Sequence, residues 1–329
     1  MAKIKKDLLV SVADANFLPQ VKQLFSSVYQ NSGWEGDYML LSDNISDSDK
    51  AWFKEKGILL FCPPLLSQIK FGHRSYPPLL FSKLYLFHEY FKKWRSVVFL
   101  DSDIIVRASF SALATLSDFN APLAITIKLK DEFVPGAKKT LPSIYNLNGE
   151  AFTTGVFAFN TDIIKKDTLT EMIGLFNKYH DLCFFGEEAI LNLFFYKNWN
   201  RVSELYNYVP WYMKDFYALK DFDFPAPIIH WVCSFKPWED NHPNKLEWQN
   251  NLAKADEINL DKRLPAKKVW TEGEIRHYIL NIKIKRMIFI TRVFIKYCDR
   301  QVGRIGLLIK KISPKLYEKI KIKKQKDDK

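Results

Sequence analysis

Val97-Val98-Phe99-Leu100-Asp101-Ser102-Asp103 is the stretch of sequence that decides the fold. Its four apolar residues have the length of a buried strand, and two carboxylates, one residue apart, follow them directly. In sheets of mostly parallel strands, ligands bind beyond the carboxyl ends of the strands. The stretch therefore predicts a buried strand whose end carries a functional site.

On both sides of this stretch, apolar runs of strand length alternate with segments of helical periodicity. Strands are expected at 7–12, 38–41, 58–61, 123–127, 155–159 and 228–229, and helices at 18–29, 47–56, 77–91, 162–179 and 187–196. This alternation predicts an α/β fold around a mostly parallel sheet. We expect the acidic residues that follow two of these strands, Asp14 and Asp101, at the carboxyl edge of that sheet.

Asp101 and Asp103 suit a divalent metal ion. Two carboxylates at one strand end can chelate a hard cation together, and Mg²⁺ or Mn²⁺ keeps open positions for phosphate oxygens. Two alternatives stay open: solvated acids that begin a loop, and a phosphatase whose first Asp is a covalent nucleophile. The phosphatase motif continues with a Thr and a turn, whereas Ile104-Ile105 follows here. The sequence contains no glycine-rich phosphate loop of the dinucleotide or P-loop type.

A second polar group follows the apolar run at 228–229. His230 is a candidate third metal ligand at a strand end. Lys236, in Lys236-Pro237-Trp238, can meet a phosphate as a point charge. A single His at such a position is otherwise a structural residue.

Together these segments resemble glycosyltransferase family 8, which contains glycogenin and bacterial lipopolysaccharide galactosyl- and glucosyltransferases. Residues 80–106 resemble the family's metal-site region, and residues 230–238 resemble its closing H-x-x-G-x-x-K-P-W signature. Between them, Phe152-Thr153-Thr154-Gly155-Val156 resembles F-N-A-G-V, and Glu187-Glu188-Ala189-Ile190-Leu191-Asn192 resembles D-Q-D-x-L-N. The order and spacing of the four pieces also fit, over roughly residues 7 to 248.

The resemblance implies a GT-A fold, a Rossmann-like mixed sheet flanked by helices. It also implies a UDP-sugar donor, dependence on Mn²⁺ (or Mg²⁺), and retention of anomeric configuration. Carried over by motif, the metal ligands are Asp101, Asp103 and His230. The implied donor-binding residues are Asp14, Asn16, Phe17, Lys83, Ser102, Thr153, Thr154 and Lys236, and the implied catalytic acids are Glu187 and Glu188. Among these, Asp14 and Asn16 would contact the uridine, and Lys236 the diphosphate.

The sequence departs from the family pattern at the sugar end of the site. Thr153 replaces an Asn, Ala189 an Asp and Cys233 a Gly, so the identity of the sugar does not transfer. Glu187 keeps an acid that is one methylene longer, whereas Glu188 replaces an amide with a carboxylate. Three roles for Glu188 stay open: the nucleophile of a double displacement, an anion that stabilises positive charge during front-face attack, or a helix N-terminal acid favoured by the helix dipole.

The excess positive charge lies at the C-terminus. Of 49 Lys and Arg and 37 Asp and Glu, 21 basic and six acidic residues fall within 262–329, a net charge of +15, which leaves −3 for the rest. From Glu272 to Tyr297, basic residues interrupt apolar ones that lie near one face of a helix: Ile275, Tyr278, Ile279, Ile282, Phe289, Val293 and Tyr297. This pattern predicts an amphipathic helix on an anionic membrane surface. Nucleic-acid binding and packing against the main domain are the alternatives.

We therefore expect a transferase domain at 1–262 and a basic membrane-association region at 263–329. The expected reaction transfers galactose or glucose from a UDP-sugar to a glycan or glycolipid acceptor, such as lipopolysaccharide or lipooligosaccharide, with no nucleic-acid partner. With no export signal and no long apolar span, we expect a bacterial cytoplasmic protein, peripheral on the inner membrane face. The scattered cysteines suggest neither a zinc site nor disulfides: Cys62, Cys183, Cys233 and Cys298. The alternative is an inactive domain that serves as a basic membrane adaptor.

Overall fold

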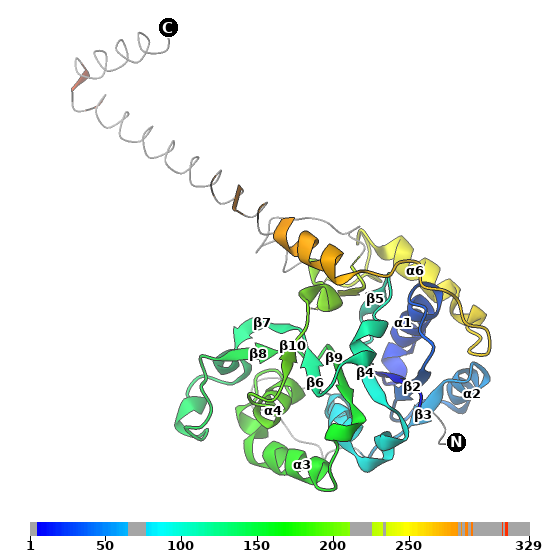
Figure 1. Cartoon of the computed structure of the whole chain (residues 1–329), viewed down its shortest axis with the longest axis horizontal. Helices are drawn as coiled ribbons and strands as arrows, with labels where there is room; N and C mark the ends of the chain where they lie inside the picture. Colours follow the sequence, from blue (N-terminus) through cyan, green and yellow to red (C-terminus); the bar gives the residue numbers. More distant parts are fainter. Residues whose placement is uncertain are drawn as a thin grey trace.

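A seven-stranded mixed sheet lies at the centre of the computed structural model, with strand order β10-β6-β9-β4-β1-β2-β3 (Figure 1). The structure describes residues 5–64, 77–210, 226–232 and 235–281, with seven further positions at 284, 287, 288, 291, 311, 313 and 314. The strands are β1 Leu8–Val12, β2 Asp37–Leu41, β3 Leu59–Phe61, β4 Ser96–Leu100, β5 Ile104–Val106, β6 Phe119–Ala121, β7 Leu123–Lys128, β8 Glu150–Phe152, β9 Val156–Asn160, β10 Asn200–Arg201 and β11 Ile228–His230. The α-helices are α1 Leu18–Asn31, α2 Asp47–Glu55, α3 Thr168–Tyr179, α4 Glu187–Phe194 and α6 Lys245–Ala253.

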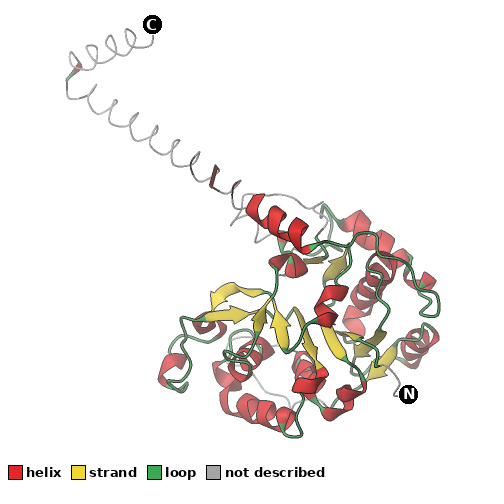
Figure 2. Cartoon of the chain, viewed as in Figure 1, coloured by secondary structure: helices red, strands yellow, loops and turns green. Residues whose placement is uncertain are grey.

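The predicted α/β architecture is confirmed. Strands β3, β2, β1 and β4 pair in parallel, and β9 runs antiparallel between β4 and β6. All five residues of β1 and all five of β4 are buried. Strands that are buried on both faces need cover on both sides, and helices flank this sheet on both sides (Figure 2).

Alternate residues of each central strand enter two separate cores. Leu8 and Val97 belong to the core that includes α3 and α4, whereas Leu9 and Val98 belong to the core that includes α1 and α6. This alternation follows from the two-residue period of a strand. The two cores fix the sheet between helical layers, so the strand ends meet at one defined edge.

Two predicted helices differ from the observed ones. Residues 77–91 form two 3-10 helices, Pro78–Phe87 and Glu89–Lys93, separated by His88 in an extended conformation. The helix predicted at 162–179 begins only at Thr168, because the Thr168 hydroxyl accepts a hydrogen bond from the Lys165 backbone N–H and holds a turn there. Apolar spacing therefore located these segments but did not determine their hydrogen-bond pattern.

Aromatic side chains fill the core under β9, which accounts for part of the high aromatic content. The rings of Phe119 and Phe195 stack with centroids 4.1 Å apart, and those of Phe87 and Phe159 at 4.5 Å. Phe157 stacks on Phe119 at 5.5 Å. Each such pair contributes roughly 0.5–1.5 kcal/mol beyond its buried area.

The C-terminal segment begins with a helix over residues 272–281. Ile275 is 9% exposed and packs into the α1/α6 core with Tyr278 and Ile279 at its margin, so the helix starts on the main body. Further on, Leu280 and Met287 are 55% and 67% exposed. No helix within the described residues is both long and apolar enough to cross a membrane. The other face residues of the predicted amphipathic helix lie outside the described residues: Ile282, Phe289, Val293 and Tyr297.

Candidate active site

The site forms where β1 and β4 end side by side. Their parallel register, Leu8↔Val97 to Val10↔Phe99, sets Asp14 and Asp101 at the same edge of the sheet. After Asp103 the chain continues into β5, which pairs antiparallel with β11. In that pairing His230 stands opposite Ile104, so a residue far along the chain reaches the end of β4.

Asp101, Asp103 and His230 offer three metal-ligand atoms, all within 4.8 Å of one another. His230 Nε2 lies 3.0 Å from Asp103 Oδ1 and 3.9 Å from Asp101 Oδ2. Two carboxylate oxygens and one imidazole nitrogen form a donor set that suits Mn²⁺ and leaves room for phosphate oxygens.

Asn207 holds the Nδ1 edge of the His230 ring, a contact that the sequence did not suggest. His230 Nδ1 and Asn207 Oδ1 are 2.8 Å apart. An amide oxygen only accepts, so Nδ1 donates to Asn207, and Nε2 is the ring nitrogen that faces the two aspartates and would bind a metal ion. Asn207 ends the 3-10 helix Glu204–Asn207 and is buried. Such a partner orients a metal-binding histidine.

Gly155 is required by the packing of the cluster. A Cβ at this position would lie 2.3 Å from His230 Cε1 and 3.0 Å from Asp101 Oδ2. The Gly155 carbonyl also accepts a hydrogen bond from the Asp101 backbone N–H at 2.9 Å. The backbone at Gly155, directly before β9, thus approaches the cluster more closely than a residue with a side chain allows.

Lys83 links the metal-ligand cluster to the start of α4. Its Nζ lies 2.9 Å from Asp101 Oδ1 and 2.7 Å from Glu187 Oε1, and it donates to the Thr154 carbonyl at 3.3 Å. Lys83 is 2% exposed. Burial alone would lower its pKa, but the two carboxylates outweigh that effect and hold the pKa above its usual range, so the side chain is a fixed buried cation.

Thr154, whose carbonyl accepts from Lys83, is also hydrogen-bonded to Glu188. Glu188 Oε2 accepts from the Thr154 backbone N–H at 2.7 Å and from its hydroxyl at 3.2 Å. The same hydroxyl lies 3.2 Å from Glu187 Oε1. Thr153 is buried, and its hydroxyl accepts from the Gly155 backbone N–H at 3.3 Å.

Lys236 contacts Asp103, whereas Lys83 contacts Asp101. Its Nζ lies 2.5 Å from Asp103 Oδ2 and donates to the Trp231 carbonyl. Burial would raise the pKa of Asp103, but His230 and Lys236 outweigh it and hold that pKa below its usual range. Asp103 is therefore ionised, as metal binding requires. Cys233, which stands for the family's Gly, lies outside the described residues.

A cavity of about 290 Å³ opens beside the cluster. Its lining includes Asp14, Phe17, Ser102 and Lys236, together with Asp101 and Asp103. Phe17 is 43% exposed and offers a ring face, while Asp14 caps the turn Ala15–Phe17 by accepting from the Asn16 backbone N–H. Asn16 is exposed and outside the cavity lining, so four of the eight expected donor-binding residues line this cavity: Asp14, Phe17, Ser102 and Lys236.

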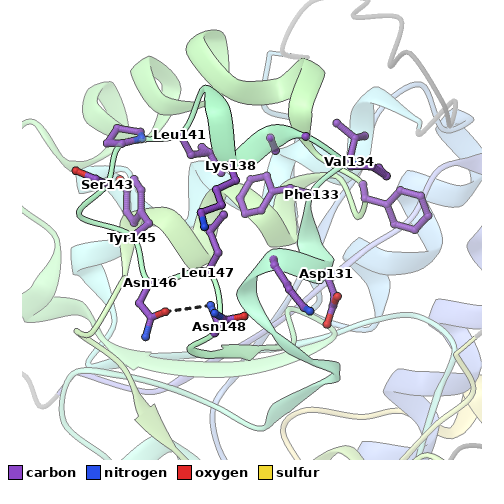
Figure 3. Close-up of a pocket in the computed structure, with 16 residues that line it drawn as sticks. Asp131, Phe133, Val134, Lys138, Leu141, Ser143, Tyr145, Asn146, Leu147 and Asn148 are labelled. Atoms are coloured by element: carbon purple, nitrogen blue, oxygen red, sulfur yellow. Dashed lines mark hydrogen bonds between the residues drawn. The ribbon is translucent and has the colours of Figure 1, made fainter.

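A larger cavity of about 880 Å³ lies within residues 130–148, with Phe184 closing one side. Figure 3 shows Phe133, Lys138 and Tyr145 around it, with Asn146 and Asn148 at its edge. The Asn148 backbone N–H donates to Asn146 Oδ1 at 3.1 Å. Aromatic rings beside amides and a lysine make a lining suited to a saccharide, although no motif in the sequence marked it.

Comparison with known proteins agrees with this geometry. Residues 8–242 match the family described as Glycosyl transferase family 8. Glycosyltransferase GlyF of Streptococcus pneumoniae is 26% identical over 262 residues, which are 74% of this chain and 60% of GlyF. Glycosyltransferase GlyE of the same organism is 22% identical over 270 residues, 75% of this chain and 61% of GlyE. The chain thus spans about three fifths of these curated relatives.

Solved structures share the fold. An active-site variant of LgtC superposes with a TM-score of 0.60 at 19% identity, covering 75% of this chain and 95% of LgtC. A galactosyltransferase LgtC complex with donor and acceptor sugar analogues gives 0.59 at 17% identity, covering 81% and 99%. The GlyE structure gives 0.54 at 20% identity, covering 80% and 67%. With a matching family sequence across most of its length and the fold of these enzymes, the chain belongs to glycosyltransferase family 8.

Proposed function

We propose that the chain transfers a hexose, galactose or glucose, from a UDP-sugar to a glycan or glycolipid acceptor with retention of configuration. The observation that carries this proposal is the cluster of Asp101, Asp103 and His230 at the wall of the cavity that Asp14 and Phe17 line. A nucleoside diphosphate needs both features: a cation site for its phosphates and an aromatic, hydrogen-bonding recess for its base.

Different residues of the site would bind different parts of the donor. A bound Mn²⁺ or Mg²⁺, held by the three-residue cluster, would supply the charge that neutralises the diphosphate leaving group. Phe17 would stack on the base and Asp14 would accept from the nucleoside, while Lys236 would meet the diphosphate. Lys83 keeps Asp101 and Glu187 in place as a buried counter-charge.

Glu188 lies in the first turn of α4 and, by the family motif, would face the transferred sugar. As a fixed anion, it would stabilise positive charge at the anomeric carbon during front-face attack. Its oxygen already accepts two hydrogen bonds from Thr154, which lowers its value as a nucleophile. Glu188→Gln separates the roles: a near-complete loss in the variant, together with a glycosyl-enzyme trapped on Glu188 of wild type with a slow donor, supports double displacement, and a near-normal rate of the variant removes both catalytic roles.

We propose that the acceptor saccharide uses the 130–148 cavity. Phe133 and Phe184 line it. Phe184 donates its backbone N–H to the Glu132 carbonyl at 2.8 Å, and the chain after Phe184 leads into α4, which begins at Glu187. The cavity is therefore connected by a short, hydrogen-bonded wall to the residues beside the donor sugar. Tyr145→Ala should raise the KM for the acceptor while leaving the KM for the donor unchanged, and equal effects on both would contradict this placement.

We also propose that the 263–329 region binds an anionic membrane surface. Its net charge is +14 (Lys262 excluded), and Leu280 and Met287 are exposed near its start. Salt-sensitive pelleting of the full chain with phosphatidylglycerol vesicles, lost on truncation at Lys267, supports this proposal. Equal pelleting by the truncated chain would contradict it.

The transfer function is tested by release of UDP. The full chain is incubated with UDP-galactose and UDP-glucose, with Mn²⁺ or with chelator, in parallel with Asp103→Asn. Release that needs both the metal and Asp103 supports the proposal. No release from either donor, with vesicle binding intact in both proteins, would favour the adaptor alternative instead.

A further inference from the structure

Glu132 is a carboxyl group that the donor site does not explain. It ends the 3-10 helix Leu129–Glu132 and is fully buried, although its neighbours Lys130 and Asp131 reach solvent. Its backbone carbonyl accepts from the Phe184 N–H at 2.8 Å, and the Val134 N–H donates to the Leu182 carbonyl at 2.9 Å. These bonds fix the turn against the segment that leads into α4. A carboxylate held there has lost its water and needs a partner.

The partner of Glu132 is Glu188, because the two side chains are hydrogen-bonded to each other. An ionised carboxylate only accepts hydrogen bonds, so two carboxyl groups can bond only when one of them holds a proton. Glu188 already accepts from Thr154 at 2.7 and 3.2 Å. Its hydrogen-bond partners therefore favour the ionised form of Glu188 and place the shared proton on Glu132.

The surrounding charges agree with one proton in this pair. Lys83 faces the cluster, but Asp101 and Glu187 already bind it at 2.9 and 2.7 Å. Glu187 and the buried Cys183 lie close enough to interact electrostatically with the pair. Burial raises the pKa of Glu188, Glu187 raises it further, and the Thr154 N–H opposes them.

We propose that Glu132 is a positioning residue for Glu188: the two buried carboxyl groups share one proton, which Glu132 donates as an O–H hydrogen bond. This bond and the Thr154 N–H together hold Glu188 as an oriented anion at the start of α4. The inference rests on the proposed transfer reaction, because it assigns Glu188 the task of facing the sugar. Two such carboxyls titrate as a pair, so a second ionisation would remove the bond and set both groups repelling.

The shared proton is tested without any substrate. Infrared spectra of the full chain are compared at neutral pH for wild type, Glu132→Gln and Glu171→Gln, an exposed acid on α3 as the control. The carbonyl stretch of a protonated carboxyl should be present in wild type and in Glu171→Gln and absent in Glu132→Gln. Its absence from wild type, or its survival in Glu132→Gln, would overturn the proposal.

The positioning role is tested by the pH profile of UDP release. Glu132→Gln keeps a hydrogen-bond donor, so kcat should stay within about threefold, while the alkaline fall that the second ionisation of the pair should cause in wild type disappears. Glu132→Leu removes the donor and should lower kcat about tenfold or more, with the donor KM little changed. The same alkaline fall in wild type and Glu132→Gln would contradict the role. If wild type releases no UDP, the transfer function and the positioning role fail together, while the infrared band still decides the shared proton.

Discussion

Gly155 and His230 are in such close contact that a Cβ on the glycine would lie 2.3 Å from the Cε1 of the imidazole. The histidine ring cannot retreat freely, because its Nδ1 is bonded to Asn207 at 2.8 Å. The position of the third candidate metal ligand therefore depends on the missing side chain of Gly155, directly before β9. This close contact explains on steric grounds why a glycine occupies position 155 in the segment Phe152-Thr153-Thr154-Gly155-Val156.

Gly155→Ala should displace His230 and weaken Mn²⁺-dependent binding of UDP by about tenfold or more. The matched control is Gly174→Ala, since a Cβ on Gly174 in α3 meets nothing within 4 Å. The control should keep UDP binding and gain roughly 0.5–1 kcal/mol of stability from the better helix former. Calorimetry and urea unfolding measure both effects, and unchanged binding by Gly155→Ala would disprove the steric argument.

Asn207→Ala should lower the affinity for Mn²⁺ by about 10–100-fold, because the His230 ring then loses the acceptor that fixes its tautomer. Asn207→Asp keeps an acceptor oxygen and should retain most of the affinity. The Mn²⁺ electron paramagnetic resonance signal of the free ion measures binding directly. Equal affinities for wild type and Asn207→Ala would show that the contact at 2.8 Å has no part in metal binding.

Lys83→Met should destabilise the metal-free protein by about 3–5 kcal/mol, because it leaves the buried Glu187 and the half-buried Asp101 without their cation. Added Mn²⁺ should restore part of the lost stability, since it brings positive charge back to Asp101. The free energy of urea unfolding, with and without Mn²⁺, measures both. Destabilisation of less than about 1 kcal/mol would mean that Lys83 is not the buried counter-charge of this network.

His242 should make stability depend on pH. Burial lowers its pKa to about 4, so the folded state keeps the ring neutral while the unfolded chain takes up a proton below about 6.5. Stability that is present above pH 6.5 is lost as the pH falls toward 4, by up to about 3 kcal/mol. The unfolding free energy of wild type minus that of His242→Leu should therefore fall as the pH falls over this range. A constant difference would contradict the assignment.

The sequence predicted the central strands, because β1 and β4 are apolar apart from Ser11 and Ser96, and it predicted the grouping of Asp14 with Asp101 at their ends. It did not predict β5, β6, β8 or β10, since strands of two or three residues carry little readable periodicity. Motif resemblance drew attention to His230, but only the pairing of β11 with β5 explains how it reaches Asp103.

Two polar residues of the site carried no signal in the sequence. Asn207 lies between two tyrosines, and its bond to His230 joins positions 23 residues apart. Glu132 follows Lys130 and Asp131, a charged run typical of an exposed turn, and only tertiary packing buries its side chain. Long-range contacts of this kind become visible only once the fold is known.

The central claim is a metal-dependent nucleoside diphosphate site built on Asp101. The most direct measurement is calorimetric titration of the full chain with UDP, with and without Mn²⁺, on wild type and Asp101→Ala. The account predicts binding to wild type that requires Mn²⁺ and that Asp101→Ala abolishes. Failure of wild type to bind UDP under either condition, or equal binding by Asp101→Ala, would contradict it.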